Sequence, residues 1–346
     1  MSVAIAVAGG GLMGRQHIKA IAESGAVRLH AVIDPDPAAQ AVAEGAGGAW
    51  FPDLAAALEV SPAPQGVILA TPNRLHVEQA LACVAAGVPV LVEKPLATST
   101  AEAARLVEAA EAAAVPVLVG HHRRHSPFAA ATKRLIETGA LGELVAADGI
   151  CWLYKPEDYF APEWRRQPGG GPILINLVHD IDLMRHFMGE VAGVQATASS
   201  ARRGFAVEDT AAVILEFASG AVATLSVSDT AVAPWSWELT AAENPAYPVT
   251  GQSCYRIAGT RAALSVPDMR LWRNPGARGW WEPIAPETVA VTREDPLLRQ
   301  IRHFAAVIEG REAPLVPARE GLATLKVVEA IRQALVTGCQ VAPGEM

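Results

Sequence analysis

The chain has 346 residues, of which 51% are hydrophobic and 18% charged, and its formal net charge is −8. This composition is typical of a globular protein with enough core for two domains, and it excludes an intrinsically disordered chain. The charges are spread along the chain without a basic block, which argues against nucleic acid or an anionic membrane surface as a partner.

The N-terminal stretch does not have the pattern of a signal peptide. Its apolar run, residues 3–8, has no cationic region before it and is soon interrupted by glycines, so it reads as a first strand. The sequence has no run of about twenty apolar residues that could span a bilayer. Neither the four cysteines nor the histidines show the spacing of metal ligands. We therefore expect a cytoplasmic protein with no membrane partner and no bound metal.

The first part of the chain has the pattern of a dinucleotide-binding unit. Three glycines at G-x-G-x-x-G spacing, Gly9, Gly11 and Gly14, follow the first strand. Gly9 permits a tight turn, Gly11 lets the backbone approach a pyrophosphate, and Gly14 lets the next helix pack close to its strand. Leu12 and Met13 lie at the start of that helix, where free N–H groups and the helix dipole stabilise a diphosphate.

The cofactor that this unit is expected to hold is NAD. A helical segment (residues 16–23) and a second strand (29–33) lead to Asp34, twenty residues after Gly14. A carboxylate at this place accepts both hydroxyls of the adenosine ribose. It also repels a 2′-phosphate, and the residues that follow supply no arginine to hold one, so NADP is less favoured.

Residues 1–121 alternate apolar strands with Ala-rich helices, which predicts a Rossmann domain with a parallel sheet covered on both faces. Ligands of such sheets bind beyond the carboxyl ends of the strands. The clearest helix covers residues 99–113, with Ser99 or Thr98 as N-cap and Glu102, three residues after Ser99, as a capping-box partner. The expected strands are residues 3–8, 29–33, 66–70, 88–92 and 115–119.

From residue 122 to residue 346 the pattern changes to that of an α+β domain with a large open, mostly antiparallel sheet. A helix at residues 127–138 precedes the strands, and a last helix at about 318–338 is expected to pack back on the first domain. Seven of the eight tryptophans lie in this second domain, as expected of a sheet face used for packing or subunit contact. The expected strands are residues 144–154, 194–200, 210–217, 221–229, 237–242 and 255–266.

Three further motifs stand in order behind the glycine turn: Thr71-Pro-Asn-x-x-His76, Glu93-Lys-Pro95 and Gly169-Gly-Gly-Pro…His179-Asp-Ile-Asp182. With the turn, they make nearly the whole chain resemble the Gfo/Idh/MocA oxidoreductases, named for glucose–fructose oxidoreductase and inositol dehydrogenase. The resemblance implies that residues at the strand ends contact the cofactor. They are Thr71, Pro72, Asn73, His76, Glu93, Lys94 and His121.

Lys94 is the first candidate for proton transfer. It is one of only five lysines and closes an apolar strand, where a surface charge gains little. A partly desolvated lysine has a lowered pKa and can pass a proton near neutrality. In the family that the chain resembles, the lysine of this motif is catalytic and hydrogen-bonds to the reacting hydroxyl. The alternative is an ion pair with Glu93 at the strand end.

His179 is the second candidate, on an expected helix after the triple glycine. A neutral imidazole can accept the proton of a substrate hydroxyl as hydride leaves the same carbon, and the family's catalytic histidine occupies this place. The alternative is a core histidine held by Asp182. Many members have an aspartate four residues before the histidine, where this chain has Ile175. Asn176 shares a helical face with His179, and whether it replaces that aspartate is left open.

The substrate-binding set is expected among cationic and aromatic residues near the domain junction. It consists of Arg123, Arg124, Lys155, Trp164 and Arg165, with Asn176 and His179. Several cations facing one pocket suit an anionic substrate, because arginine holds a carboxylate through two hydrogen bonds. The segment before Gly169–Gly171 is expected to close over the site as a lid. The alternative is a solvated charged face. Within the family, this region resembles dihydrodiol-carboxylate dehydrogenases of aromatic degradation.

The sequence therefore predicts an NAD-dependent oxidoreductase that acts on a CH–OH carbon of a small sugar, cyclic polyol or hydroxylated carboxylate. Lys94 and His179 would handle the proton, and the cofactor would carry the hydride. Two alternatives are a glycosidase that uses NAD transiently and a non-catalytic sensor that binds the nucleotide. A homo-dimer or homo-tetramer is expected through the exposed sheet of the second domain.

Overall fold

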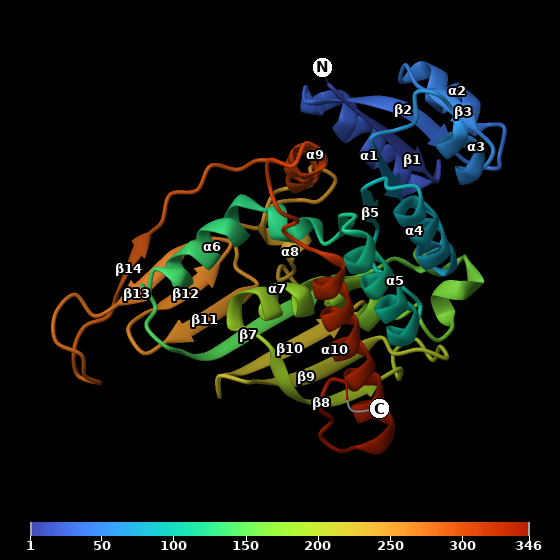
Figure 1. Cartoon of the computed structure of the whole chain (residues 1–346). Coiled ribbons are helices and arrows are strands. Elements are labelled where there is room, and N and C mark those ends of the chain that lie inside the picture. The colour runs from blue at the N-terminus through green and yellow to red at the C-terminus, as the bar shows by residue number, and fades with distance from the viewer. Residues whose placement is uncertain (1, 345–346) are drawn as a thin grey trace. The chain divides into compact units, whose positions relative to one another are not determined.

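The computed structural model describes residues 2–344, which form two compact units (Figure 1). Unit 1 comprises the chain up to His125 together with Asp295–Leu325, and unit 2 comprises Ser126–Glu294 with the residues from Lys326 onward. This division differs from the expected boundary at residues 121 and 122. A late segment of the chain, residues 295–325, belongs to the first unit instead of the second.

Unit 1 contains the predicted parallel sheet, in the strand order β3-β2-β1-β4-β5-β6 of a doubly wound fold. The chain changes direction across the sheet between β1 and β4, where ligands of such folds bind. Glycines and polar residues follow the carboxyl ends of these strands. The strands are β1 (Val3–Ala8), β2 (Val27–Ile33), β3 (Ala49–Phe51), β4 (Gly66–Leu69), β5 (Val90–Val92) and β6 (Val117–Val119).

Both faces of this sheet are buried, because successive strand residues alternate between two apolar clusters. One face packs on α3, α4, α5 and the beginning of α10, and the other packs on α1, α2 and α9. The helices are α1 (Leu12–Ser24), α2 (Ala39–Gly45), α3 (Leu54–Glu59), α4 (His76–Ala85), α5 (Thr100–Ala113), α9 (Pro296–Ile308) and α10 (Ala318–Thr337).

The helix α9 explains why residues 295–325 belong to unit 1. Its buried residues Ile301 and Phe304 lie in the same cluster as Ile68, Leu91 and Leu118 of the central strands. The helices α1 and α2 follow β1 and β2, so this distant segment supplies the remaining cover for that face. The sequence analysis did not predict α9. It did place the last helix, α10, which begins in unit 1 and ends in unit 2.

Unit 2 contains an eight-stranded sheet in the order β14-β13-β12-β11-β7-β10-β9-β8. All neighbouring strands are antiparallel except β7 and β10, which are parallel. The predicted mostly antiparallel sheet is confirmed. The strands are β7 (Leu144–Trp152), β8 (Val191–Ser199), β9 (Thr210–Phe217), β10 (Val222–Ser228), β11 (Tyr255–Gly259), β12 (Ala263–Val266), β13 (Arg270–Arg273) and β14 (Ala285–Thr288).

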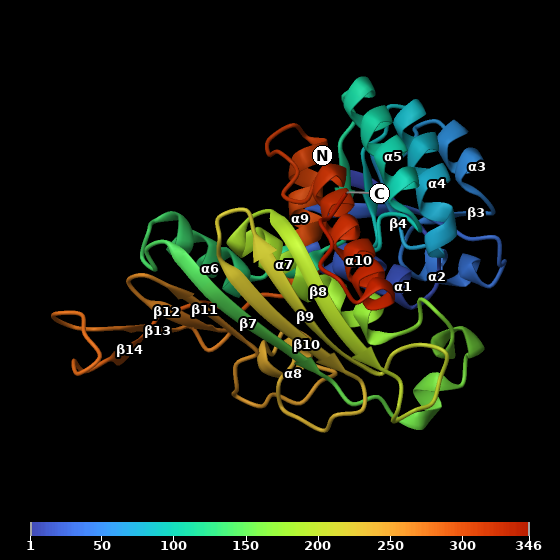
Figure 2. The ribbon, with the colours of Figure 1, turned by 90° about the horizontal axis from the view of Figure 1, so that it is seen from below.

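One face of this sheet is covered and the other is open. The helices α6 (Pro127–Glu137) and α7 (Val178–Met188) and the later turns of α10 share an apolar cluster with the inward residues of the strands. Figure 2 looks onto the opposite face, where β7, β8, β9 and β10 lie in front of the helices. Because outward residues alternate with buried ones along β9 and β10, this open face is built from side chains that no helix covers.

Two predicted strands of unit 2 were wrong. The segment 237–242 contains a short helix, α8 (Trp237–Thr240), because Ser236 accepts a hydrogen bond from the backbone N–H of Leu239 and so caps a helical turn. The segment 255–266 is two antiparallel strands, β11 and β12, joined by a tight turn. Among residues 2–344, no helix is long and apolar enough to cross a bilayer.

Candidate functional site

The glycine turn after β1 is shaped by close backbone contacts. Gly9 has φ +98°, and a Cβ added there would lie 2.5 Å from the carbonyl oxygen of Ala70. A Cβ on Gly14 would lie 1.8 Å from the carbonyl oxygen of Gly9, so the helix can approach the turn only with glycine at this position. A Cβ on Gly11 would meet no atom within 4 Å. The protein therefore leaves open space beside Gly11. Such space is needed if a diphosphate is to come close to the backbone at this position.

The first turn of α1 presents its backbone N–H groups without a side-chain cap. Gly11 is the N-cap residue, in extended conformation, and the first turn contains no acidic residue. Leu12 and Met13 are exposed at this helix start, with relative accessibilities of 78% and 37%. Uncapped N–H groups and the positive end of the helix dipole make this a suitable place for an anion such as the diphosphate.

Asp34 lies at the carboxyl end of β2 and is held by the backbone. Its Oδ2 accepts a hydrogen bond from the N–H of Gly10 at 2.7 Å, and its Oδ1 accepts one from the N–H of Asp36 at 2.9 Å. Nε of Arg15 donates to the carbonyl oxygen of Gly10 at 3.0 Å. The open glycine, the uncapped helix start and the oriented carboxylate together fit NAD, with the ribose placed toward Asp34.

The residues after β4 divide into two groups. Pro72 and Asn73 are exposed at the end of β4, so their surfaces are accessible to a bound cofactor. His76 is fully buried, and its Nδ1 and Nε2 each lie 2.9 Å from a backbone carbonyl oxygen, of Pro95 and Thr71 respectively. We therefore revise the expectation for His76, because its ring nitrogens are engaged by the protein and not directed at a cofactor.

Glu93, at the end of β5, is also buried and engaged by the protein. Its Oε1 lies 2.7 Å from Nε2 of His17, and its Oε2 accepts a hydrogen bond from the N–H of Lys94 at 3.2 Å. Burial alone would raise the pKa of Glu93, but the hydrogen bond from His17 and the charges of His17, His122 and Lys94 lower it to about 2. The sequence analysis missed His17, although it lies only three residues after Gly14 on the helix that begins the site.

The basic stretch after β6 does not supply an open cationic surface. His121, Arg123 and Arg124 are all buried. Arg124 Nη2 lies 2.9 Å from a carboxylate oxygen of Glu320 on α10, and both residues belong to unit 1. The expectation that Arg123 and Arg124 bind substrate is therefore not supported, because arginine at a strand end can equally stabilise its own domain through a buried ion pair.

In unit 2, His179 is buried in the first turn of α7. A π-helical segment, Ile173–Leu177, leads directly into this helix, and the N–H of Val178 donates to the carbonyl oxygen of Ile173 five residues earlier. Asn176 lies within the π-helical segment. The expectation that Asn176 and His179 share one face assumed a regular α-helix, so it does not apply here. Segments of this kind occur often at functional sites.

Two of the three glycines before α7, Gly170 and Gly171, are tightly packed and do not resemble part of a flexible lid. A Cβ on Gly170 would lie 2.4 Å from the carbonyl oxygen of Trp164, and one on Gly171 would lie 2.3 Å from a carboxylate oxygen of Glu208. That oxygen of Glu208 accepts a hydrogen bond from the N–H of Ile173 at 3.1 Å. Glycine is required here for close contact between segments, so the expectation of a closing loop is not supported.

Two of the predicted substrate residues, Lys155 and Arg165, lie against one ring, that of Tyr159, and a third, Trp164, lies against Arg165. Nζ of Lys155 lies 4.8 Å from the ring centroid, and the guanidinium carbon of Arg165 lies 4.0 Å from it. Arg165 also lies 5.2 Å from the ring of Trp164, which is half exposed. Two cations held by one aromatic ring form a positive cluster on a single unit, whereas the predicted Arg123 and Arg124 lie on the other.

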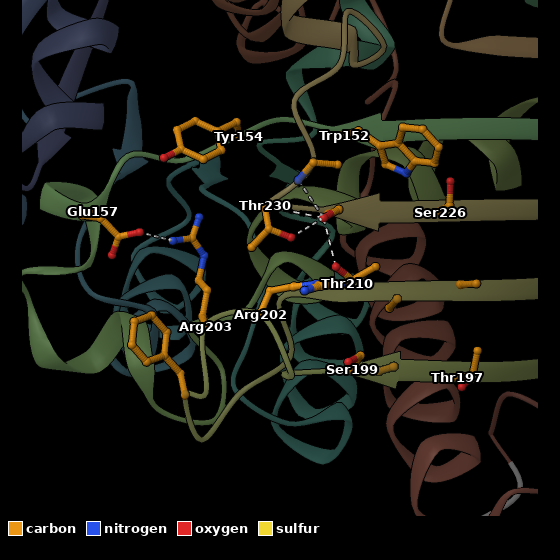
Figure 3. Close-up of a pocket in the computed structure, with 16 residues that line it drawn as sticks. Trp152, Tyr154, Glu157, Thr197, Ser199, Arg202, Arg203, Thr210, Ser226 and Thr230 are labelled. Carbon is orange, nitrogen blue, oxygen red and sulfur yellow. Dashed lines mark hydrogen bonds and ion pairs between the residues drawn. The ribbon is translucent and has the colours of Figure 1, made fainter.

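A separate hollow of about 860 Å³ lies on the open face of the sheet, and Figure 3 shows its lining. None of the predicted substrate residues lines it. Several of its polar groups bond to one another: Arg203 pairs with Glu157, and Thr210 and Thr230 share hydrogen bonds with Ser228. These paired groups are less available to a substrate than unpaired donors and acceptors would be.

Comparison with known proteins places this architecture in a family. Residues 3–121 match the model of an oxidoreductase family with an NAD-binding Rossmann fold, and residues 129–265 match the GFO/IDH/MocA C-terminal domain. Inositol 2-dehydrogenase 2 of Saccharopolyspora erythraea is 35% identical over 238 residues, 66% of this chain and 67% of the relative. Rhizopine catabolism protein MocA of Rhizobium meliloti is 32% identical over 54% of this chain and 57% of its own length.

A solved structure of levoglucosan dehydrogenase, in complex with NADH and levoglucosan, superposes with a TM-score of 0.83. It covers 100% of both chains at 20% sequence identity, so it supports the fold alone. The family matches and the inositol dehydrogenase relative agree with the predicted cofactor and reaction type, and they do not favour a glycosidase or a sensor. The chain belongs to the Gfo/Idh/MocA oxidoreductases, a family of NAD-binding sugar and polyol dehydrogenases.

Proposed function

We propose that the protein transfers hydride between the nicotinamide of NAD and a CH–OH carbon of a small sugar, cyclic polyol or hydroxylated carboxylate. The observation that carries the proposal is the edge of one parallel sheet in unit 1. It combines the open glycine turn, the oriented carboxylate of Asp34 and, at the end of β5, Lys94. The inositol dehydrogenase relative supports a cyclic polyol as the class to test first.

The cofactor supplies the hydride acceptor when bound, and residues of this chain hold it. The N–H groups at the start of α1 bind the diphosphate, and Asp34 accepts hydrogen bonds from the ribose hydroxyls. Thr71, Pro72 and Asn73, which follow β4 at the switch point of the sheet, contact the nicotinamide half. This assignment retains the accessible residues after β4 as cofactor contacts. It omits His76 and Glu93, which are buried and bond to other residues of the protein.

Lys94 and His179 move the proton of the reacting hydroxyl. Lys94 hydrogen-bonds to the hydroxyl oxygen through Nζ, and a ring nitrogen of His179 accepts the proton as hydride departs. His179 suits this role because imidazole changes charge near neutral pH. Asn176 orients the substrate from the π-helical segment that precedes α7. Neither side chain needs a metal, since proton transfer and hydride transfer together complete the reaction.

The substrate residues on unit 2 are Lys155 and Arg165, which lie against the ring of Tyr159, and Trp164, whose ring lies against Arg165. Their cluster favours a substrate that carries a carboxylate, since guanidinium and ammonium groups bind carboxylates by charge-assisted hydrogen bonds. The exposed ring of Trp164 offers an apolar face to a cyclic carbon skeleton. A hydroxylated cyclic carboxylate satisfies both features.

The test is NADH formation, measured by absorbance, across a panel of cyclic polyols, sugars, sugar acids and dihydrodiol carboxylates. Turnover should appear in one class, and Lys94→Ala should lower kcat/KM by about 10²–10⁴-fold, the usual contribution of general acid–base catalysis. Arg74→Ala, an exposed cation in the turn after β4, is the matched control for charge loss. Confirmed NAD binding with no turnover in any class would contradict the proposal, and sugar release without net NADH would indicate a redox-assisted glycosidase.

The open face of the unit 2 sheet supports assembly into a homo-dimer or homo-tetramer. Its outward residues include Ile214, Val222 and Trp152, which share the surface with small hydroxyl side chains. Two such faces can pack together as the sheets of a sandwich do. Light scattering should show a multiple of the chain mass, and Ile214→Glu should reduce it. A monomer in the wild type would contradict this assembly.

A further inference from the structure

The turn that carries Lys94 is attached on both sides to buried histidines. The residue before it, Glu93, bonds to His17 on α1, and the residue after it, Pro95, bonds through its carbonyl oxygen to His76 at the start of α4. Both histidines have a relative accessibility of 0%, and both belong to unit 1. Each contact is 2.7–2.9 Å long, so the Glu93–Lys94–Pro95 turn is linked to two different helices.

The contact with His17 fixes the side of the turn that precedes Lys94. One carboxylate oxygen of Glu93 meets Nε2 of His17, and the other accepts the N–H of Lys94 itself. A Cβ on Gly120 would lie 3.0 Å from this carboxyl group, so the neighbouring strand end leaves no free space beside it. The carboxylate of Glu93 therefore links α1, through His17, to the backbone N–H of Lys94. The charged groups that act on it are His17, His122 and Lys94.

The contact with His76 fixes the side that follows Lys94. One ring nitrogen meets the carbonyl oxygen of Pro95 and the other meets that of Thr71, which follows β4. Thr71 in turn donates its hydroxyl to Oε1 of Gln79 on α4 at 2.6 Å. After Pro95, Leu96 is buried in the apolar cluster. His76 thus joins the segment after β4, which contains the proposed nicotinamide residues, to the turn after β5.

We propose that His17 and His76 are positioning residues for Lys94, holding its turn from opposite sides so that the side chain leaves the strand end in one direction. The inference rests on the proposed function of Lys94. His17 lies one turn after Gly14 on α1, so the helix whose start is proposed to bind the diphosphate is also the helix that holds Glu93. Helix α1 would then both bind the nucleotide and hold the turn that carries Lys94.

The alternative is that both histidines only stabilise the fold. A donor-retaining variant separates the two roles, because a glutamine amide can donate from about the place of a histidine Nε2 while the ring is lost. His17→Gln should therefore preserve the link to Glu93, whereas His17→Leu should leave a buried carboxylate without its partner. His76→Gln and His76→Leu form the corresponding pair. His30→Leu is the control, since β2 is separated from β5 by β1 and β4.

The first readout does not need a substrate. The chain has only five lysines, so protein labelled with ¹³C at lysine Cε gives five resonances, and Lys94→Arg assigns the one of interest. Glu93→Gln should lower the titration midpoint of Lys94, because it removes a nearby opposite charge. His17→Leu and His76→Leu should shift or broaden this resonance alone, while the two glutamine variants and His30→Leu should leave it at the wild-type position.

The second readout is turnover with saturating NAD. Misplacement of a catalytic group by about 1 Å can cost on the order of 10²-fold, so the leucine variants should lower kcat by about that factor. The glutamine variants should recover most of kcat, and the dissociation constant of NADH should stay within about twofold of the wild type. Circular dichroism and thermal melts verify that each variant is folded, and a leucine variant that does not fold is replaced by His17→Asn or His76→Asn.

The outcomes separate this inference from the proposed function. If Lys94→Ala retains full turnover, the proposed role of Lys94 fails, whatever the histidine variants do. If Lys94→Ala loses turnover while folded His17→Leu and His76→Leu keep both the wild-type Lys94 titration and the wild-type kcat, only the positioning inference fails. Loss in the leucine variants with no recovery in the glutamine variants would indicate a purely structural role.

Discussion

The polar groups at the strand ends of unit 1 differ from those on the open sheet face of unit 2 in whether the protein already satisfies their hydrogen bonds. At the end of β1, the first N–H groups of α1 have no side-chain cap, and the space beside Gly11 is open. In the large hollow of unit 2, Arg203 donates to the carboxylate of Asp229, and the hydroxyls of Thr210, Ser228 and Thr230 hydrogen-bond to one another. A ligand needs donors and acceptors that the protein has not already used. The glycine turn of unit 1 is therefore a better candidate site than the large hollow of unit 2.

The two regions also use glycine differently. Gly14 in unit 1 and Gly171 in unit 2 permit contacts that any side chain would block, whereas Gly11 borders open space. The first two serve packing within the chain and the third leaves room for a bound molecule. Gly14 therefore has a structural role, and substitutions can distinguish it from the binding role proposed for Gly11, three residues away.

The largest effect is expected for Gly14→Ala. Its Cβ would lie 1.8 Å from a backbone oxygen, so α1 must move away from the turn. We expect a loss of more than about 3 kcal/mol of unfolding free energy, above the usual cost of overpacking, and loss of NADH binding. Urea unfolding and fluorescence titration measure the two effects. Gly11→Ala is the control and should change stability by less than about 0.5 kcal/mol while weakening NADH binding.

Glu93→Gln should come next, with an effect that depends on pH. The pKa of Glu93 is lowered from 4.5 to about 2, so its ionised form stabilises the folded protein above pH 4.5, and this contribution is lost as the pH falls toward 2. Breaking a buried pair should cost about 3 kcal/mol near neutral pH. The difference in unfolding free energy between wild type and variant, measured by urea unfolding, should become smaller as the pH falls from 4.5 to 2. A gap that stays constant with pH would contradict the assigned pair.

Asp34→Ala should act on binding and leave the fold of unit 2 unchanged. Removing a charged acceptor of the ribose hydroxyls should weaken NADH by about 1.5–3 kcal/mol, roughly 10- to 150-fold. NADPH should bind better than it does to the wild type, because the repulsion of a 2′-phosphate is removed. Parallel fluorescence titrations with NADH and NADPH test this. Asp36→Ala, on the exposed residue two positions later, is the matched control.

The smallest effect is expected for Gly171→Ala in unit 2. Its Cβ would press on the carboxylate of Glu208, which is a side chain and can move partly, so the cost should be about 1–3 kcal/mol. NADH binding should not change. The control is Gly276→Ala, where a Cβ would meet no atom within 4 Å. If Gly171→Ala proved as stable as the wild type, with a more accessible segment before α7, the region would be mobile after all and the lid expectation would return.

Local patterns predicted most of the fold. The strand Val3–Ala8, the capped helix Thr100–Ala113 and the last helix, Ala318–Thr337, were placed from apolar periodicity and capping residues alone. One error concerns a helix whose place in the fold depends on contacts distant in sequence, and the other concerns a local helix cap. Helix α9 was missed, and the extended reading of residues 237–242 failed where Ser236 caps a helical turn.

The candidate site divides in the same way. Spacing alone predicted the glycine turn and Asp34 as cofactor-binding candidates, because the turn and the carboxylate belong to adjacent segments of the chain. Histidine and arginine side chains near the strand ends could not be assigned from spacing, since a buried partner and a ligand require the same residue types. His76 and Arg124 were read as binding residues, yet their partners are Pro95, Thr71 and Glu320.

By itself, the sequence determined the fold family, the cofactor and the position of Lys94, because each depends on short-range pattern and chain geometry. Only the tertiary structure decided which polar side chains are free to act, because burial and pairing depend on segments far apart in the chain. His17 shows this most clearly: nothing in its local sequence distinguishes it from an ordinary helix residue, but the fold brings it within 2.7 Å of Glu93.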